Sequence, residues 1–125
     1  MSNLDHDMAY FLELERKLNS ITTYMSNINS CLNRFFYEKN LEDILISGLT
    51  HVRKKAIKNT RKYLYECKTS YFESADEVLD SMTEFNDLYR KAMKLDISTK
   101  DVKYLRELFK LYSLALYRIA VMGGI

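Results

Sequence analysis

Proline is absent from this chain of 125 residues, and glycine occurs only three times, at Gly48, Gly123 and Gly124. Proline interrupts helices because it lacks a backbone N–H and its ring clashes with the preceding turn, and tight turns often require proline or glycine. A chain with so little of either is predicted to consist almost wholly of uninterrupted helices. An all-β or α/β fold would need more turn residues than this sequence contains.

The sequence also lacks the signatures of a catalytic, metal or cofactor site. It has no glycine-rich phosphate loop. Carboxylate metal sites in helical bundles use Glu-x-x-His, but neither His6 nor His51 has an acid three residues before it. Cys31 and Cys67 fall within helical patterns without an assignable basic partner, which favours small core residues over nucleophiles. We therefore expect a protein that is not an enzyme, with no catalytic residue, metal or cofactor.

Long apolar segments are lacking as well. Residues 111–125 form a long stretch with few charges, which Arg118 interrupts. They would form about 22 Å of helix, which is shorter than the ~30 Å hydrocarbon core of a bilayer, so a buried helix is expected rather than a membrane span. Residues 1–14 are acidic rather than basic, unlike a secretory signal. We expect a reducing cytosol with both thiols free, in a bacterium, an archaeon or an infected host cell.

The composition is that of one globular domain. Hydrophobic residues make up 47% and charged residues 29% of the chain, which is too apolar for a disordered protein. No internal repeat and no low-complexity linker divides the sequence. We therefore expect a single domain over residues 1–125.

A regular apolar pattern near the amino end indicates a long amphipathic helix. The apolar residues follow one another at spacings of three and four, and they are Phe11, Leu14, Leu18, Ile21, Met25, Ile28, Leu32 and Phe35. Such a seam must pack against other helices, because it gains nothing from contact with water. The pattern predicts a helix from about Leu4 to Tyr37.

Three further amphipathic segments complete the predicted fold. One runs from Asn40, which is expected to cap it, to about Cys67, with a kink at Gly48. The next is predicted over residues 75–95, after a capping box formed by Ser74 and Glu77. The last is predicted to begin at Ser98 or Thr99. These segments predict an antiparallel four-helix bundle. Its first helix is about twelve residues longer than the third or fourth, so its end projects or packs on a second copy.

The face opposite the seam of the first helix carries no charge over residues 18–33. Its expected outward positions are Asn19, Ser20, Thr22, Thr23, Ser26, Asn27, Asn29, Ser30 and Asn33. Because association surfaces are depleted in charge at their centre, this face is a candidate protein interface. The candidate interface residues are Asn19, Thr23, Ser26, Asn27 and Ser30, with Phe36 and Tyr37 as candidate aromatic anchors. For these two aromatic residues, packing in the core or at a corner of the bundle is the alternative. The alternative is a weakly helical face in contact with solvent.

Charge is divided between two consecutive segments. Between His51 and Lys68 lie seven basic residues and one acid, whereas six acids and no base lie between Thr69 and Tyr89. Neighbouring helices would let the two strips neutralise each other. The alternative is a nucleic-acid-binding site formed by Lys54, Lys58, Arg61 and Lys62, with Tyr63 and Tyr65 as stacking groups. A net charge of only +2 disfavours this alternative.

These features favour a non-enzymatic protein–protein interaction module, with the option of a homodimer formed through the first helix. An adaptor, an inhibitor from a virus or mobile element, an immunity protein and a chaperone-like protein are all roles that small helical bundles fill. Nucleic-acid binding by the basic strip is the competing hypothesis.

Overall fold

The computed structural model describes residues 3–66 and 71–122, and it describes side chains for residues 8–62, Leu64 and residues 75–122. The described residues form four helices and no strand: α1 (Asn3–Glu38), α2 (Asp43–Glu66), α3 (Tyr71–Met93) and α4 (Thr99–Met122). Each helix packs against the next along the chain, α4 packs back on α1, and α2 also approaches α4 across the centre. The prediction of an all-helical, four-helix bundle is confirmed.

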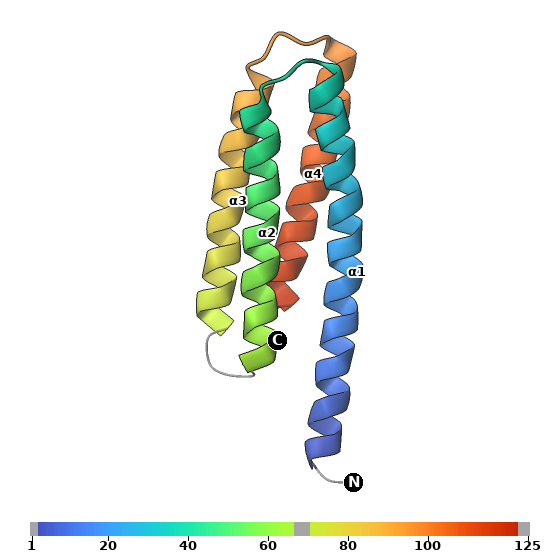
Figure 1. The fold of residues 1–125 in the computed structure, drawn as a ribbon, viewed down its shortest axis with the longest axis vertical. Coiled ribbons are helices and arrows are strands. Elements are labelled where there is room, and N and C mark those ends of the chain that lie inside the picture. The colour runs from blue at the N-terminus through green and yellow to red at the C-terminus, as the bar shows by residue number, and fades with distance from the viewer. Residues whose placement is uncertain (1–2, 67–70, 123–125) are drawn as a thin grey trace.

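The four helices lie side by side, as Figure 1 shows. The α1–α2 and α3–α4 connections lie at the same end of the molecule, whereas the end of α2 and the start of α3 lie at the other. The first helix has 36 residues, against 24, 23 and 24 for the others, so its predicted excess length is confirmed. The amino-terminal part of α1 extends past the ends of its neighbours in Figure 1.

The apolar seam of α1 lies in the bundle core, as its spacing predicted. Six of its eight residues are buried, and Phe11 and Ile21 are partly buried against the core. At the end of the bundle that holds the two short connections, the core is aromatic. Phe85 packs against Phe109 at a ring-centroid distance of 4.9 Å, and Phe109 also meets Tyr89 at 5.1 Å. Aromatic contacts of this kind add to the stability gained from burial alone.

Asn40 does not cap the second helix as predicted, because it closes the first one. Its φ of 54° is left-handed, which Asn tolerates better than most residues. The Asn40 amide donates to the Tyr37 carbonyl oxygen (3.2 Å), and the Leu41 amide donates to the Phe36 carbonyl oxygen (2.8 Å). These two bonds form a Schellman motif, which satisfies the last carbonyls of α1. The second helix then starts only at Asp43.

The predicted start of the third helix is wrong, and that of the fourth is confirmed. Ser74 lies inside α3, which already begins at Tyr71, because extending a helix adds a hydrogen bond per residue and outweighs a weak local capping preference. By contrast, Ser98 caps α4. Its Oγ accepts a hydrogen bond from the Asp101 amide (3.3 Å) and donates one to Asp101 Oδ2 (2.8 Å).

Gly48 lies where α2 and α3 approach closely. A Cβ atom at this position would lie 2.8 Å from Cδ2 of Leu88 on α3. The absence of a side chain therefore lets the two helices pack tightly at this level. The helix is continuous from Asp43 to Glu66, so Gly48 does not break it, and the kink stays a prediction.

Candidate interaction surfaces

The uncharged face of α1 is divided between a flank that α2 covers and a surface in contact with solvent. On the covered flank, Asn19 Oδ1 accepts a hydrogen bond of 2.9 Å from Nη2 of Arg61 on α2. Ser26 and Asn33 follow Asn19 at intervals of seven residues, so they lie on the same flank, and both are half-buried. Two of the predicted interface residues, Asn19 and Ser26, therefore contribute to the contact between α1 and α2.

Two positions that were expected to point outward are buried instead. Thr22 and Asn29 are each only 8% exposed. The Thr22 hydroxyl donates to the Asn19 carbonyl oxygen at 2.9 Å, whereas Oδ1 of Asn29 has no hydrogen-bond partner among the described residues. A charged side chain at these positions would lose its water on burial in the bundle. Burial therefore explains part of the missing charge without any second protein.

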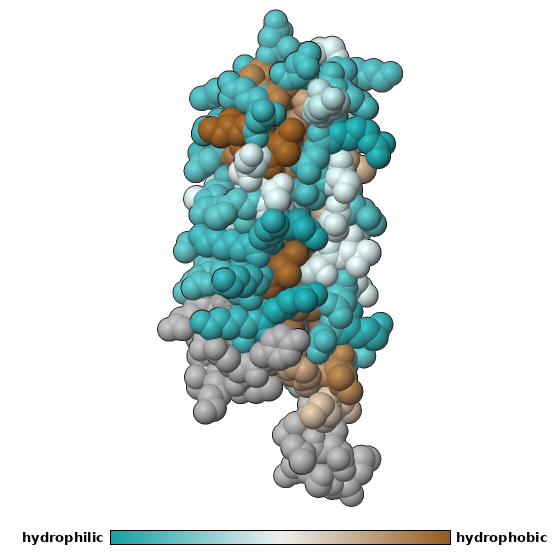
Figure 2. All heavy atoms as spheres, in the orientation of Figure 1, coloured by the Kyte–Doolittle hydropathy of each residue, from teal (hydrophilic) through white to brown (hydrophobic). Residues whose placement is uncertain are grey.

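The solvent-facing remainder forms what we call the outer α1 face. Its uncharged members are exposed and belong to two columns with a spacing of seven residues, namely Ser20 with Asn27 and Thr23 with Ser30. The first column continues to Glu13 at one end and to Arg34 at the other, both of which are exposed. Figure 2 shows pale, near-neutral side chains where α1 lies, beside the hydrophilic surface over α2 and α3. The predicted residues Thr23, Asn27 and Ser30 thus share one accessible surface.

The two expected aromatic anchors separate. Phe36 is 1% exposed, and its ring contacts Phe35 and Phe109 at centroid distances of 6.2 and 6.3 Å. It belongs to the aromatic core, so its assignment as an anchor for a partner is wrong. Tyr37, by contrast, is 80% exposed at the end of α1. A hydrophobic ring with a polar hydroxyl at such a site is typical of protein interfaces.

The basic strip of α2 is only partly neutralised by α3. Lys55 Nζ lies 3.1 Å from Glu84 Oε1, and this is the one ion pair between the two helices among the described side chains. Arg61 turns to Asn19 on α1 instead. Lys54, Lys58 and Lys62 are exposed and make no ion pair within the described part of the chain. The four candidate nucleic-acid-binding residues therefore do not form one site, because Arg61 is directed away.

A surface hollow of about 490 Å³ lies beside this strip. It is lined by His51, Lys54, Lys55, Lys58, Asn59 and Glu77. Three lysines favour an anion there, but the carboxylate of Glu77 opposes one. Tyr63 and Tyr65, the expected stacking groups, have side chains outside the described set.

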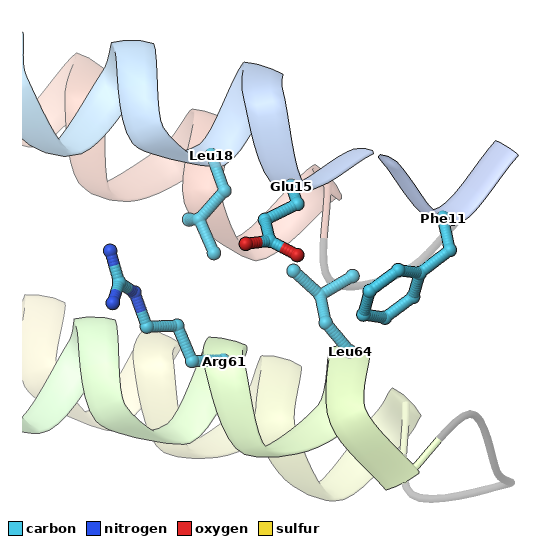
Figure 3. A pocket seen from close by; sticks show the side chains of 5 residues that line it. All are labelled: Phe11, Glu15, Leu18, Arg61 and Leu64. Atoms are coloured by element: carbon cyan, nitrogen blue, oxygen red, sulfur yellow. The ribbon is translucent and has the colours of Figure 1, made fainter. Parts of the chain in front are cut away.

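A second, small hollow lies between α1 and α2, near the projecting end of α1. Figure 3 shows Phe11, Glu15 and Leu18 from α1 facing Arg61 and Leu64 from α2. The Glu15 carboxylate points towards α2 between two apolar side chains, and the Arg61 guanidinium points towards α1. This arrangement joins the two helices and leaves little room for a ligand.

A tyrosine hydroxyl lies within the core of the bundle. Tyr112 is fully buried, and its ring stacks on Phe85 at 4.6 Å with an interplanar angle of 28°. Its hydroxyl and Nε of Arg53 lack hydrogen-bond partners among the described residues. Burial raises the pKa of Tyr112 far above its ordinary value, and the positive charge of nearby Arg53 offsets part of that rise. The hydroxyl therefore remains neutral at physiological pH and supplies no nucleophile.

Sequence reasoning missed an exposed apolar stripe on α4. Leu114, Tyr117 and Val121 follow at spacings of three and four, and they are 42%, 55% and 44% exposed. Their signal is present in the sequence, but such spacing also describes a buried seam. Only the packing of α4 shows which of its apolar residues face solvent.

Within residues 3–66 and 71–122, no helix is long and apolar enough to cross a membrane. Among the side chains that the structure describes, in residues 8–62, Leu64 and residues 75–122, no group of three His, Cys, Asp or Glu could hold a metal ion. His6 and Cys67 have side chains outside the described set, and Cys31 is a partly buried free thiol. Comparison of the chain with protein-family models, curated proteins and solved structures found no match.

Proposed function

We propose that this protein is a non-enzymatic protein–protein interaction module that uses the outer α1 face. The observation that carries the proposal is the lack of charge on a surface that is accessible to solvent. Ser20, Thr23, Asn27 and Ser30 are exposed in the middle of a long helix. Such residues are poor in helix interiors, where an exposed face usually carries Glu, Lys or Arg. A helix that keeps this composition is better suited to contact with another protein, since interfaces are depleted in charge at their centre.

Two features of the bundle support the same proposal. Tyr37 lies at one end of the outer α1 face, where it offers a large exposed ring. The amino-terminal part of α1 extends past its neighbours and carries Met8 and Leu12, which are 53% and 57% exposed. We propose that the protein acts in the cytoplasm as an adaptor, inhibitor, immunity or chaperone-like protein, with self-association through α1. The bundle is proposed to be antiparallel, which the positions of the helix ends in Figure 1 support.

The proposal is tested by placing a charge on the outer α1 face. We expect the mass of the Asn27→Glu variant in light scattering to be lower than that of the wild-type protein and to approach the 14.8 kDa of one chain. Asn86→Glu on α3 is the matched control, because Asn86 is equally an exposed asparagine within a helix. Helical circular dichroism confirms that both variants fold. An unchanged mass for Asn27→Glu would contradict self-association through this face. Retention of the same proteins by both variants in a pull-down would contradict binding of a partner protein through this face.

Nucleic-acid binding remains the second candidate, favoured by one observation. Lys54, Lys58 and Lys62 are exposed at spacings of four, which places them along one line of α2. We expect the double variant Lys54→Glu, Lys58→Glu to abolish any binding to DNA or RNA, and we expect binding to fall as salt rises. The control is the double variant Lys100→Glu, Lys103→Glu, because it makes the same change in net charge at two exposed lysines of α4. Equal loss in both variants would indicate attraction by net charge rather than a site.

A further inference from the structure

We infer that the outer α1 face binds the outer α1 face of a second copy of this chain, with the two helices antiparallel and Glu13 opposite Arg34 of the partner subunit. This inference rests on the proposed function and adds the identity of one partner, the orientation and the register. It follows from the column of exposed residues Glu13, Ser20, Asn27 and Arg34, which share one line of α1 at intervals of seven. The two uncharged members lie between an acid and a base.

The charges at the two ends of this column are both exposed and of opposite sign. Arg34 is exposed and makes no ion pair within the described part of the chain. Glu13 is exposed and binds Arg16 on the same helix, with Oε1 2.7 Å from Nη2. This contact lowers the pKa of Glu13, so its carboxylate stays ionised. Each copy therefore presents, at one end of the face, a carboxylate that binds Arg16 and, at the other end, a cation that makes no ion pair within the described part of the chain.

The signs of these charges select the antiparallel orientation. In a symmetric pair, residue i contacts residue j, and j contacts i. A parallel pair in register would place Glu13 against Glu13 of the partner subunit and Arg34 against Arg34 of the partner subunit. Like charges that face each other are unfavourable, whereas the antiparallel pair forms two opposite-charge contacts. The symmetry axis then passes between Thr23 and Tyr24, within the charge-free segment.

The same register also gives a long contact between the two helices. With Glu13 opposite Arg34 of the partner subunit, residues 9–38 of each copy overlap. The exposed ring of Tyr37 then reaches the level of Tyr10 of the partner subunit, where the ring is 46% exposed. No charged residue in this overlap faces a like charge at its own level.

Two other antiparallel registers are less favourable. A shift by four residues would place Lys17 opposite Arg34 of the partner subunit. It would also place Glu13 opposite Glu38 of the partner subunit, so each end of the contact would contain two pairs of like charges. A shift by seven would pair Arg16 with Glu38 of the partner subunit, but it would shorten the overlap to residues 16–38. The uncharged centre of the face disfavours few alternative registers by itself, so the charges at its two ends determine the register.

The experiment exchanges the two charges between chains. Glu13→Arg alone and Arg34→Glu alone each turn two attractive contacts of the dimer into repulsive ones. We expect each to raise the dissociation constant of the homodimer about tenfold, as measured by sedimentation equilibrium. An equimolar mixture of the two variants restores both opposite-charge contacts in a heterodimer. We therefore expect the mixture to dimerise within about twofold of wild type, and native mass spectrometry to find mainly the heterodimer.

Glu38→Arg is the matched control, because it makes the same charge change at another exposed position of α1. In the inferred register it lies at the level of Ala9 of the partner subunit, so we expect little change in the dissociation constant. A weaker dimer with Glu38→Arg, or a mixture that fails to recover, overturns the register while self-association stands. If the wild-type chain remains monomeric at every concentration, the inference that a second copy is the partner is wrong. Binding of another protein through the same face is then tested by Asn27→Glu.

Discussion

Arg61 on α2 donates a hydrogen bond of 2.9 Å to Oδ1 of Asn19 on α1, although the two residues lie 42 positions apart in the chain. The sequence pattern predicts a different surface for each residue, a protein interface for Asn19 and a nucleic-acid site for Arg61. Because the two side chains bind each other, Arg61 turns away from the other cations of the basic strip, and Asn19 does not belong to the outer α1 face. It also places α2 against one flank of α1.

This contact predicts energetic coupling between the two side chains. We expect Asn19→Ala and Arg61→Ala each to lower the free energy of unfolding by about 0.5–1 kcal/mol, because the bond is exposed to water. The double variant is expected to cost little more than either single variant, as measured by urea denaturation. Lys62→Ala is the control, because Lys62 is exposed and unpaired within the described part of the chain. Strictly additive losses would show that the two side chains do not interact in solution.

The buried hydroxyl of Tyr112 predicts that a smaller side chain increases stability. Tyr112→Phe keeps the ring stacked on Phe85 and removes an oxygen that has no partner among the described residues. Because an unsatisfied buried polar atom costs about 1–3 kcal/mol, we expect the free energy of unfolding to rise by about 1 kcal/mol in urea titrations. Tyr89→Phe is the control, since Tyr89 is only partly buried. A loss of stability in Tyr112→Phe would mean that the hydroxyl is hydrogen-bonded in the folded protein.

An ion pair between the α1–α2 connection and α4 predicts a dependence of stability on pH. Nζ of Lys39 lies 2.9 Å from Oδ2 of Asp101. The hydrogen bond from Lys39 and that from Ser98 hold the pKa of Asp101 below its ordinary value. Because the folded-state pKa is lowered, the stabilisation is complete above a pH of about 4 and is lost as the pH falls through the lowered pKa.

We therefore expect Asp101→Asn to be less stable than wild type at pH 7, with the difference shrinking at about pH 2.5. Urea denaturation at the two pH values measures it. Asp96→Asn is the control, since Asp96 is exposed and unpaired among the described side chains. If the difference in the free energy of unfolding between wild type and Asp101→Asn is the same at both pH values, the charge of Asp101 does not contribute to stability.

The close approach of α2 and α3 predicts how Gly48 responds to substitution. Alanine favours a helix interior over glycine by about 1 kcal/mol, but its Cβ at this position would meet Leu88 at 2.8 Å. We expect Gly48→Ala to stabilise the protein more in a Leu88→Ala background than in wild type, by about 1 kcal/mol. Thermal unfolding of the four proteins measures this coupling. Equal effects in both backgrounds would show that Leu88 moves aside at no cost.

Much of the fold could be predicted because helix formation and amphipathic periodicity are local properties. The absence of proline and the seam from Phe11 to Phe35 predicted the long first helix, and Ser98 predicted the start of the last. Local signals failed where two of them competed. Asn40 suits both the start and the end of a helix, and only the observed backbone, with its positive φ, shows that it ends α1.

The candidate site could be predicted only in part. The sequence by itself determined that residues 18–33 carry no charge and that the face opposite the seam is polar. It did not determine which neighbour lies beside that face, since helix periodicity defines a core-facing side but not the width of the contact. The tertiary structure decided that Thr22 and Asn29 are buried, that Phe36 joins the aromatic core, and that Thr23, Asn27 and Ser30 stay in contact with solvent. The physical reason is that burial depends on residues far away in the chain, whereas helical periodicity depends only on near neighbours.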